Sequence, residues 1–169
     1  MKYSSDTTKE EIFSEIEKYL NDQDLWINTI DTSRPWGGFF VLDESDADKF
    51  IKLYFSHLNK EDLTISGKLS PKILVVAPDK KLSWQYHHRR AEIWKLIGGK
   101  AAVATSDDDT EKETTYLQIG DIIQLKQGER HRLIGLDEWG IVAEIWRHTD
   151  ATNPSDEDDI VRVQDDFGR

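Results

Sequence analysis

The stretch from Lys72 to Ser106 decides the fold, and it reads KILVVAPDKKLSWQYHHRRAEIWKLIGGKAAVATS. Its apolar or alternating runs are separated by Pro78-Asp79 and Gly98-Gly99, which are turn signals. Similar runs continue to residue 148 as TTYLQI, IIQLK, HRLIGL and WGIVAEIWRH, and an acidic run at residues 107–109 is typical of an exposed hairpin tip. We therefore predict seven or eight short strands over residues 72–148, arranged as an antiparallel sandwich or barrel.

The residues before this stretch predict helices. Residues 1–30 form a helical segment in which Thr8 and Glu11 suit a capping box. Its apolar side chains recur with helical spacing at Ile12, Phe13, Ile16, Tyr19 and Leu20, so we expect one helix at about 8–20 that the polar residues 21–24 end. A second helix is expected at about 46–58, with a stripe formed by Phe50, Ile51, Tyr54, Phe55 and Leu58. We expect residues 59–70 to form a loop and the charged tail, 149–169, to lie on the surface.

Composition limits the classes of function. A chain of 169 residues predicts a single domain, 1–169. With 33 acidic and 22 basic residues the net charge is −11, which disfavours binding to nucleic acids or anionic membranes. No apolar run is long enough to span a membrane, and the polar start is unlike a secretion signal, so we expect a cytoplasmic protein. The absence of cysteine excludes thiol catalysis and leaves histidine, carboxylate or amide oxygen as metal ligands.

The residues that carry chemistry surround the segment QYHHRRAEIW, residues 85–94. Residues two apart in a strand share a face, so Gln85 and His87 point the same way. A hairpin over residues 88–91 would then bring Glu92 beside them, and His131 begins a later strand. Gln85, His87, Glu92 and His131 together form a two-nitrogen, two-oxygen set that suits a divalent metal with an open position. The alternative is a polar surface patch, which is how we interpret His57 and His148.

The spacing of these residues resembles that of a known family. Gln-x-His-x4-Glu-x6-Gly, from Gln85 to Gly99, resembles the first motif of the cupin superfamily, with Gln in place of its first His. Gly120, Lys126, Gly128 and His131 resemble the second motif. With Arg34-Pro35-Trp36-Gly37 and the tail EDDIVRVQDDFGR (157–169), the chain is similar to type II mannose-6-phosphate isomerases. It is also similar to the isomerase half of bifunctional mannose-1-phosphate guanylyltransferases. The resemblance covers residues 34–42 and 72–169.

The resemblance implies a fold, a metal and an activity. The fold is mainly β, a cupin double-stranded β-helix (jelly-roll) barrel with the N-terminal α-helices packed outside. The cofactor is a divalent metal, for which zinc is the first choice and iron, manganese, cobalt and nickel are alternatives. The activity is the interconversion of mannose 6-phosphate and fructose 6-phosphate, so a small phosphorylated sugar is the expected partner. Pairing of two copies through sheet edges, as a homodimer, is expected by analogy.

Departures from the family pattern leave alternatives open. Arg89 and Ile93 stand where the family has histidines, and Lys126 and Gly135 replace its usual Pro and Asn. We expect Arg89 and Ile93 to border the pocket, where they would indicate a different phosphosugar, for example a heptose phosphate, for an isomerase or epimerase. A non-catalytic sugar-binding cupin is the alternative of another class, because this fold hosts many functions.

The resemblance also suggests roles for single residues. Arg90 is the first choice for phosphate binding or catalytic support, and Glu92 combines a catalytic role with metal binding. Lys81 and Trp94 are expected to contact the substrate. Arg162 and Arg169 are weaker candidates, and Arg132 is expected outside because it alternates with His131. The general base is not identified, and His88 is interpreted as an outward-facing turn residue.

Overall fold

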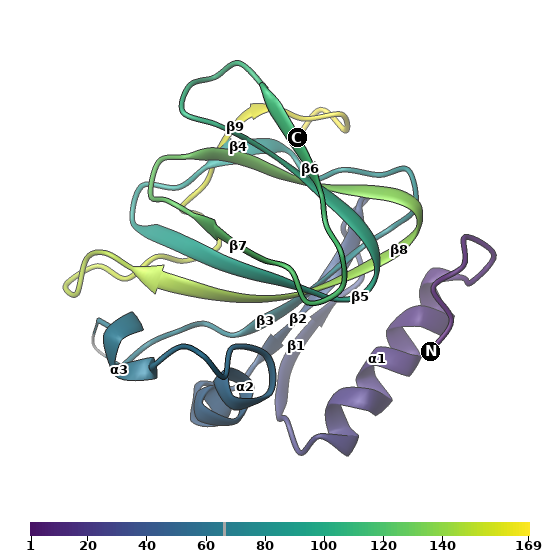
Figure 1. The fold of residues 1–169 in the computed structure, drawn as a ribbon, viewed down its shortest axis with the longest axis horizontal. Coiled ribbons are helices and arrows are strands. Elements are labelled where there is room, and N and C mark those ends of the chain that lie inside the picture. Colours follow the sequence, from purple (N-terminus) through teal and green to yellow (C-terminus); the bar gives the residue numbers. More distant parts are fainter. Residues whose placement is uncertain (66) are drawn as a thin grey trace.

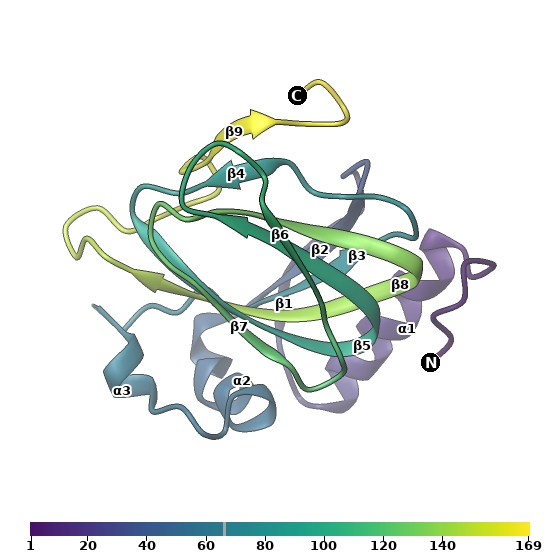
Figure 2. The ribbon, with the colours of Figure 1, turned by 45° about the horizontal axis from the view of Figure 1, so that its top comes forward.

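The structure is a computed structural model that describes residues 1–65 and 67–169. Within those residues, nine strands form one antiparallel sheet that curls around an interior (Figures 1 and 2). The three α-helices gather outside the curled sheet, beside its first strands. The prediction of a mainly β fold with the N-terminal helices packed outside is therefore confirmed. None of the described helices is long and apolar enough to cross a membrane.

The elements follow one another along the chain with two helical regions before the main run of strands. They are α1 (Lys9–Asp22), β1 (Ile27–Asp31), β2 (Gly37–Leu42), the 3₁₀-helix η1 (Glu44–Asp46), α2 (Ala47–Tyr54), α3 (Lys60–Leu63), β3 (Lys72–Val76), β4 (Trp84–Tyr86), β5 (Arg90–Ser106), β6 (Glu113–Tyr116), β7 (Ile122–Leu125), β8 (Arg130–His148) and β9 (Val161–Gln164). The sheet order is β1-β2-β3-β8-β4-β9, and β5 pairs with β6, β7 and β8. The hairpin between β5 and β6 confirms the acidic tip at residues 107–109.

Helix α1 begins as predicted. The Thr8 hydroxyl accepts from the Glu11 backbone N–H, and the Glu11 carboxylate accepts from the Thr8 N–H. The apolar face of the helix is buried against the sheet, where Phe13 stacks on Phe40. The predicted helix at about 8–20 is therefore confirmed, but the helical segment expected over residues 1–30 also contains the edge strand Ile27–Asp31, whose backbone pairs with β2.

The helix expected at about 46–58 is shorter in the structure. Helix α2 ends at Tyr54, and Phe55 follows with a non-helical backbone. The predicted loop at 59–70 contains the single-turn helix α3, which Asn59 caps by accepting a hydrogen bond from the Glu61 N–H. Phe50 and Phe55 are both fully buried, so this segment covers the sheet rather than standing apart from it.

Two apolar clusters lie on opposite faces of the central strands. On β8, Ile141 and Ala143 join the cluster that the helices cover, whereas Val142 joins the cluster inside the barrel. On β3, Ile73 and Leu74 divide in the same way. This period-two division explains why the strands near residue 74 have continuous apolar sequences, since both of their faces are buried.

The Gly98-Gly99 pair is not a turn, as the sequence suggested, but a bend inside the long strand β5. The pairing register of β5 with β8 shifts on both sides of it. Gly99 has φ +65°, and a Cβ there would lie 1.7 Å from the Trp139 carbonyl oxygen. Runs that were read as separate strands are therefore single bent strands of 17 residues in β5 and 19 in β8.

The link between β4 and β5 is not a hairpin, which corrects another expectation. β4 pairs with β8 and β9, and Gln85 lies opposite His131. β8 also pairs with β5, where Trp146 lies opposite Glu92. It is therefore β8 that brings the two predicted ligand strands together. The tail does not simply cover the surface either, because β9 joins the sheet and Ser155 and Asp159 are buried.

Candidate functional site

A polar pocket of about 320 Å³ opens into the barrel interior. The side chains that line it come from β2, β3, β4, β5, β8 and the C-terminal tail, together with the loops that precede β2 and β4. They are Arg34, Trp36, Phe39, Lys72, Leu74, Leu82, Ser83, Gln85, Arg90, Glu92, Trp94, Glu144, Glu157, Asp158, Ile160, Arg162 and Arg169. Of the predicted site residues, Gln85, Arg90, Glu92 and Trp94 line this pocket, whereas Lys81 does not and forms an isolated bridge with Ile134 instead.

Three of the predicted metal ligands converge in the buried end of the site. One ligand atom from each of His87, Glu92 and His131 lies within 4.8 Å of the other two. His87 Nε2 is 3.1 Å from Glu92 Oε1, and His131 Nε2 is 3.5 Å from Glu92 Oε2. Gln85, the fourth predicted ligand, pairs with His131 in the sheet and is 6% exposed.

The backbone orients both imidazoles toward the carboxylate. His87 Nδ1 is 2.7 Å from the Asp159 carbonyl oxygen, and His131 Nδ1 is 3.0 Å from the Glu129 carbonyl oxygen. A carbonyl only accepts, so each Nδ1 carries the proton and each neutral ring presents an unprotonated Nε2. Within the described residues, His131 Nε2 is buried without a hydrogen-bond partner. Two nitrogen lone pairs and a carboxylate facing one another fit a bound divalent cation.

The electrostatics of the cluster agree with this geometry. Burial lowers the pKa of His87, which favours the neutral ring that a metal requires. Burial alone would raise the pKa of Glu92, but its contacts with His87, Arg90 and His131 hold that pKa well below the usual range. These directions favour an ionised Glu92 carboxylate and a neutral His87 ring, which is the protonation state that metal binding requires of them.

Arg90 lies at the start of β5 and contacts the donor set directly. Its Nε donates to Glu92 Oε1 at 2.8 Å, and its guanidinium stacks on the Trp146 ring at 3.7 Å. One terminal nitrogen donates to the Ser155 hydroxyl and to the Asp156 carbonyl oxygen in the tail. Arg90 therefore donates most of its hydrogen bonds within the protein, where they orient Glu92 and hold the tail in place.

Asp159 is a site residue that the sequence reasoning missed. Its carboxylate accepts hydrogen bonds from the His88 and Arg89 backbone N–H groups and from the Ser155 hydroxyl. Burial opposes ionisation, but these hydrogen bonds lower the pKa of Asp159 to about 2. Because its carbonyl oxygen also orients His87, Asp159 joins the tail to the donor set. The run of acidic residues in the tail was the available signal, and it was attributed to the surface.

Glu144 is the second missed residue, and it lies deep in the pocket with an exposure of 4%. Its Oε2 accepts from Trp94 Nε1 at 2.7 Å, and its Oε1 accepts from Trp146 Nε1 at 2.8 Å. Burial and the nearby charge of Glu92 raise the pKa of Glu144 to about 8. The alternation along β8 could have found it, since Glu144 falls on the same face as Val142 and Trp146.

Cationic side chains line the outer part of the pocket. Arg34, Lys72, Arg162 and Arg169 all contribute to its lining. Burial lowers the pKa of Arg162, and the neighbouring guanidinium groups of Arg169 and Arg34 lower it further. Lys72 is buried against the Phe39 and Trp146 rings and forms an ion pair with Glu157. Arg34 and Arg169 also have carboxylate partners, Asp31 at 3.1 Å and Asp165 at 2.7 Å, so Arg162 is the lining cation of this group without an ion pair in the described part of the chain.

Several expectations about other residues need correction. Arg132 is not outside: it is 1% exposed, and its Nε donates to the Leu82 carbonyl oxygen. His148 is not on the surface either, because its ring contacts Ser70 Oγ and accepts from the Ser155 N–H. His57 and His88 are exposed, as predicted.

Two of the departures from the family pattern, Arg89 and Ile93, lie away from the pocket lining. Ile93 belongs to the cluster that the helices cover, on the other face of β5. The Arg89 Nε donates to the Asn153 carbonyl oxygen in the tail, and its guanidinium lies 3.6 Å from an oxygen of Asp156. Neither residue borders the pocket, which corrects the expectation that they would indicate a different sugar.

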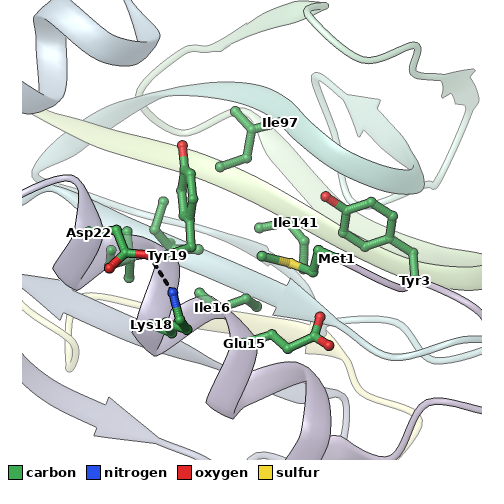
Figure 3. A pocket seen from close by; sticks show the side chains of 11 residues that line it. Met1, Tyr3, Glu15, Ile16, Lys18, Tyr19, Asp22, Ile97 and Ile141 are labelled. Atoms are coloured by element: carbon green, nitrogen blue, oxygen red, sulfur yellow. Dashed lines mark hydrogen bonds and ion pairs between the residues drawn. The ribbon is translucent and has the colours of Figure 1, made fainter.

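A second pocket, of about 530 Å³, lies between α1 and the sheet (Figure 3). Ile16, Ile97 and Ile141 form its apolar part, and Tyr3 and Tyr19 also line it. Its ionic side chains are Glu15, Lys18 and Asp22 of α1, of which Lys18 donates to Asp22 at 2.7 Å. This pocket holds no grouping of metal ligands like that in the barrel, so we assign the chemistry to the polar pocket.

An antiparallel barrel with two histidines and a glutamate converging on its interior defines a cupin, and the fold is of cupin type. Within the cupins, the chain belongs to the family described as mannose-6-phosphate isomerase C-terminal, whose profile matches residues 49–165. The match includes residues 49–70, which the motif comparison had left outside the resemblance.

Similar proteins agree with this membership. The xanthan biosynthesis protein XanB of Xanthomonas campestris pv. campestris (strain B100) is 26% identical over 162 residues, which are 94% of this chain and 27% of the relative. The alginate biosynthesis protein AlgA of Pseudomonas aeruginosa is 29% identical over 145 residues, 84% of this chain and 24% of the relative. The chain thus spans about a quarter of the length of these relatives.

A solved structure supports the fold alone. The capsular polysaccharide assembling protein CapF from Staphylococcus aureus matches with a TM-score of 0.52 and 13% sequence identity. The match covers 83% of this chain and 34% of that protein. At this identity the likeness concerns the arrangement of the strands and carries no statement about activity.

Proposed function

We propose that this chain is a metal-dependent sugar-phosphate isomerase that interconverts mannose 6-phosphate and fructose 6-phosphate. One observation carries the proposal: a metal-binding set and a cationic lining share the same pocket. The membership in the mannose-6-phosphate isomerase C-terminal family supports the same reaction class.

The donor set gives the pocket its chemistry. Gln85, His87, Glu92 and His131 would hold the metal, and zinc is our first choice because nitrogen and oxygen donors suit it. A divalent ion held there supplies a Lewis acid that polarises the carbonyl and hydroxyl oxygens of the substrate. Arg90 keeps the Glu92 carboxylate in place, and Asp159 keeps His87 in the tautomer that leaves Nε2 free.

The cationic lining gives the pocket its preference for phosphate. The C6 phosphate of a hexose phosphate is a dianion, and the chain as a whole repels it. Arg34 and Arg169 are paired with Asp31 and Asp165, whereas Arg162 has no ion pair in the described part of the chain. An incoming phosphate would supply the anion that Arg162 lacks and would reduce its repulsion by Arg34 and Arg169. We therefore assign the phosphate to this arginine group, whereas Arg90 positions Glu92.

A coupled assay with hexose and heptose phosphates tests the proposal. We expect turnover of mannose 6-phosphate that chelation abolishes and zinc restores, and no turnover of unphosphorylated mannose. Protein purified without a histidine tag should contain about one divalent ion per chain. Metal-loaded protein that binds the phosphosugars but converts none of them would establish the non-catalytic alternative, and conversion of a heptose phosphate alone would change the substrate.

Matched variants distinguish the metal-binding residues from the arginine proposed to bind phosphate. His131→Ala should lose both metal and turnover, whereas His57→Ala, which alters an exposed histidine, should lose neither. Arg162→Ala should keep its metal and raise KM by about 10-fold or more, the size expected for loss of a charge-assisted hydrogen bond. Arg147→Ala is the control, because Arg147 lies exposed on the same protein. Unchanged KM in Arg162→Ala would refute the phosphate assignment.

A further inference from the structure

An aldose–ketose isomerase needs a group that takes a proton from C2 and delivers one to C1. Four carboxylic side chains line the pocket, namely Glu92, Glu144, Glu157 and Asp158. Glu92 is engaged by both histidines and by Arg90, and Glu157 and Asp158 are exposed at the chain's acidic tail. Glu144 is the buried carboxyl of this group that the metal-binding set does not use.

The position of Glu144 relative to the donor set is fixed by one indole. Trp94 Nε1 donates to Glu144 Oε2 at 2.7 Å and to Glu92 Oε2 at 3.0 Å. The carboxyl of Glu144 is therefore separated from a proposed metal ligand by a single N–H group. A substrate whose O1 and O2 face the metal-binding set would bring C1 and C2 close to Glu144.

The hydrogen bonds around Glu144 leave it able to act. Each of its oxygens accepts one indole N–H, from Trp94 or from Trp146. A carboxylate has about four acceptor positions, so each oxygen keeps capacity for one more proton or donor. The two indoles fix the orientation of the carboxyl without using its reactive capacity, and their own packing in the barrel holds them in place.

We propose that Glu144 is the proton-transfer residue of this site, moving the proton between C2 and C1 of the bound sugar phosphate. The inference rests on the proposed isomerase function and assigns the general base, which the sequence left unidentified. Lys72 of β3 pairs with Glu144 in the sheet, and Arg90 stacks on Trp146. These two cations and the Glu92 carboxylate are the charges that face Glu144 from the strands packed against it.

The step balances without an external oxidant or reductant. The Glu144 carboxylate takes the proton from C2, the C2–H electron pair forms the C1=C2 bond, and the C1=O1 π pair moves to O1. The O2 hydroxyl proton passes to O1. The O2 lone pair then forms C2=O2, while the C1=C2 pair takes the proton back from Glu144 at C1. An aldose has become a ketose, and Glu144 is again a carboxylate.

Glu144→Gln tests the proposal, because glutamine keeps the size and one acceptor but cannot carry the proton. We expect kcat on mannose 6-phosphate to fall by about 10²- to 10⁴-fold, the usual contribution of a positioned acid–base group. Metal content and the dissociation constant for mannose 6-phosphate should stay within about 3-fold of the parent protein. Because the proton held by Glu144 can exchange with solvent before it is returned, the parent protein in D₂O should place deuterium at C1 of part of the product, as read by proton NMR, and the variant should not.

Two further variants keep the test decisive. Glu144→Asp retains a carboxyl and should recover part of the lost kcat, which a merely structural role for the side-chain volume would not produce. Asp137→Asn removes an exposed carboxyl from the same strand, outside the pocket lining, and should leave kcat within about 2-fold. A Glu144→Gln protein that keeps its turnover and its deuterium exchange overturns the assignment while the isomerase function stands. Parent protein that converts no phosphosugar overturns both.

Discussion

The two sides of strand β8 carry very different side chains. Facing the helices, Ile141, Ala143 and Ile145 join an apolar cluster closed by α1 and α2. Facing the barrel interior, Val142 is followed by Glu144, which is buried among the indoles of the polar pocket. One strand therefore serves the stability of the fold on one side and the chemistry of the site on the other.

The difference shows what the barrel interior is for. A buried carboxylate or guanidinium costs several kcal/mol unless it is paired, and an apolar replacement is often neutral or stabilising. If the barrel interior served only as a hydrophobic core, it would be filled with apolar side chains, as is the face of the sheet that the helices cover. Here Arg90, Glu92 and Glu144 are buried in the lining of one pocket, and His87 and His131 are buried beside Glu92. This concentration of buried polar groups indicates a function, because stability alone does not require it.

The largest effect on stability should come from the helix side. Phe40→Ala empties a fully buried site where the ring stacks on Phe13, with centroids 5.2 Å apart. We expect the free energy of unfolding to fall by about 3–5 kcal/mol, as in other large-to-small core substitutions. Urea unfolding of the metal-free protein measures it, and Leu53→Ala at an exposed position should stay within about 0.5 kcal/mol. Zinc affinity should not change, and a parallel loss of affinity would show that the two sides are coupled.

The second effect concerns the tail beside the site. Asp159→Asn weakens hydrogen bonds to an ionised carboxylate, so unfolding at pH 7 should become easier by about 2 kcal/mol. The pKa of Asp159 is lowered to about 2, so the stabilisation is full above the ordinary carboxyl pKa and is lost as the pH falls toward 2. The gap between parent and variant should therefore close between about pH 4 and 2. Asp158→Asn, at the neighbouring exposed carboxyl, should show no such gap.

Much of the fold and part of the metal-binding set could be predicted from the sequence. The capping box of α1, the alternation of the strands and the spacing of Gln85, His87 and Glu92 depend on residues close together in the chain. Local rules therefore suffice for them. Residues 27–30, which were included in the expected helical segment, form a strand because the pairing of β1 with β2 outweighs local helical preference. Gly98-Gly99 was misread because a bend in a long strand and a turn use the same residues.

The parts of the site that were missed depend on distant segments. Asp159 contacts His87 across 72 residues, and Glu144 contacts Trp94 across 50. Arg132 was placed outside by its alternation with His131, and His148 by its place near the tail. Neither rule tells which distant segment covers a side chain. Both residues are buried, and the C-terminal tail contributes partners to each of them. Burial by a segment distant in the chain leaves no recognisable pattern in the residues around the buried side chain.

The smallest expected effect is a pH-dependent contribution of His148, at the end of β8, to the free energy of unfolding. Its ring contacts the Ser70 hydroxyl and accepts a hydrogen bond from the Ser155 N–H, so it fastens the tail to the segment before β3. Burial lowers the pKa of His148 to about 4, below the value of 6.5 for a free side chain. The unfolded chain therefore binds the proton first, and this contribution to stability is full above about pH 6.5 and is lost as the pH falls toward 4.

His148→Asn tests this linkage, because the asparagine oxygen can still accept from Ser155 but does not titrate. Between pH 7 and 5 the parent protein should lose about 1–2 kcal/mol more stability than the variant in the metal-free form. Other titrating groups, Glu144 among them, remain in both proteins and cancel in the difference. Paired urea titrations at the two pH values measure it. Parallel losses in both proteins would mean that His148 is protonated without strain, and that the tail is held mainly by Asp159 and Arg90.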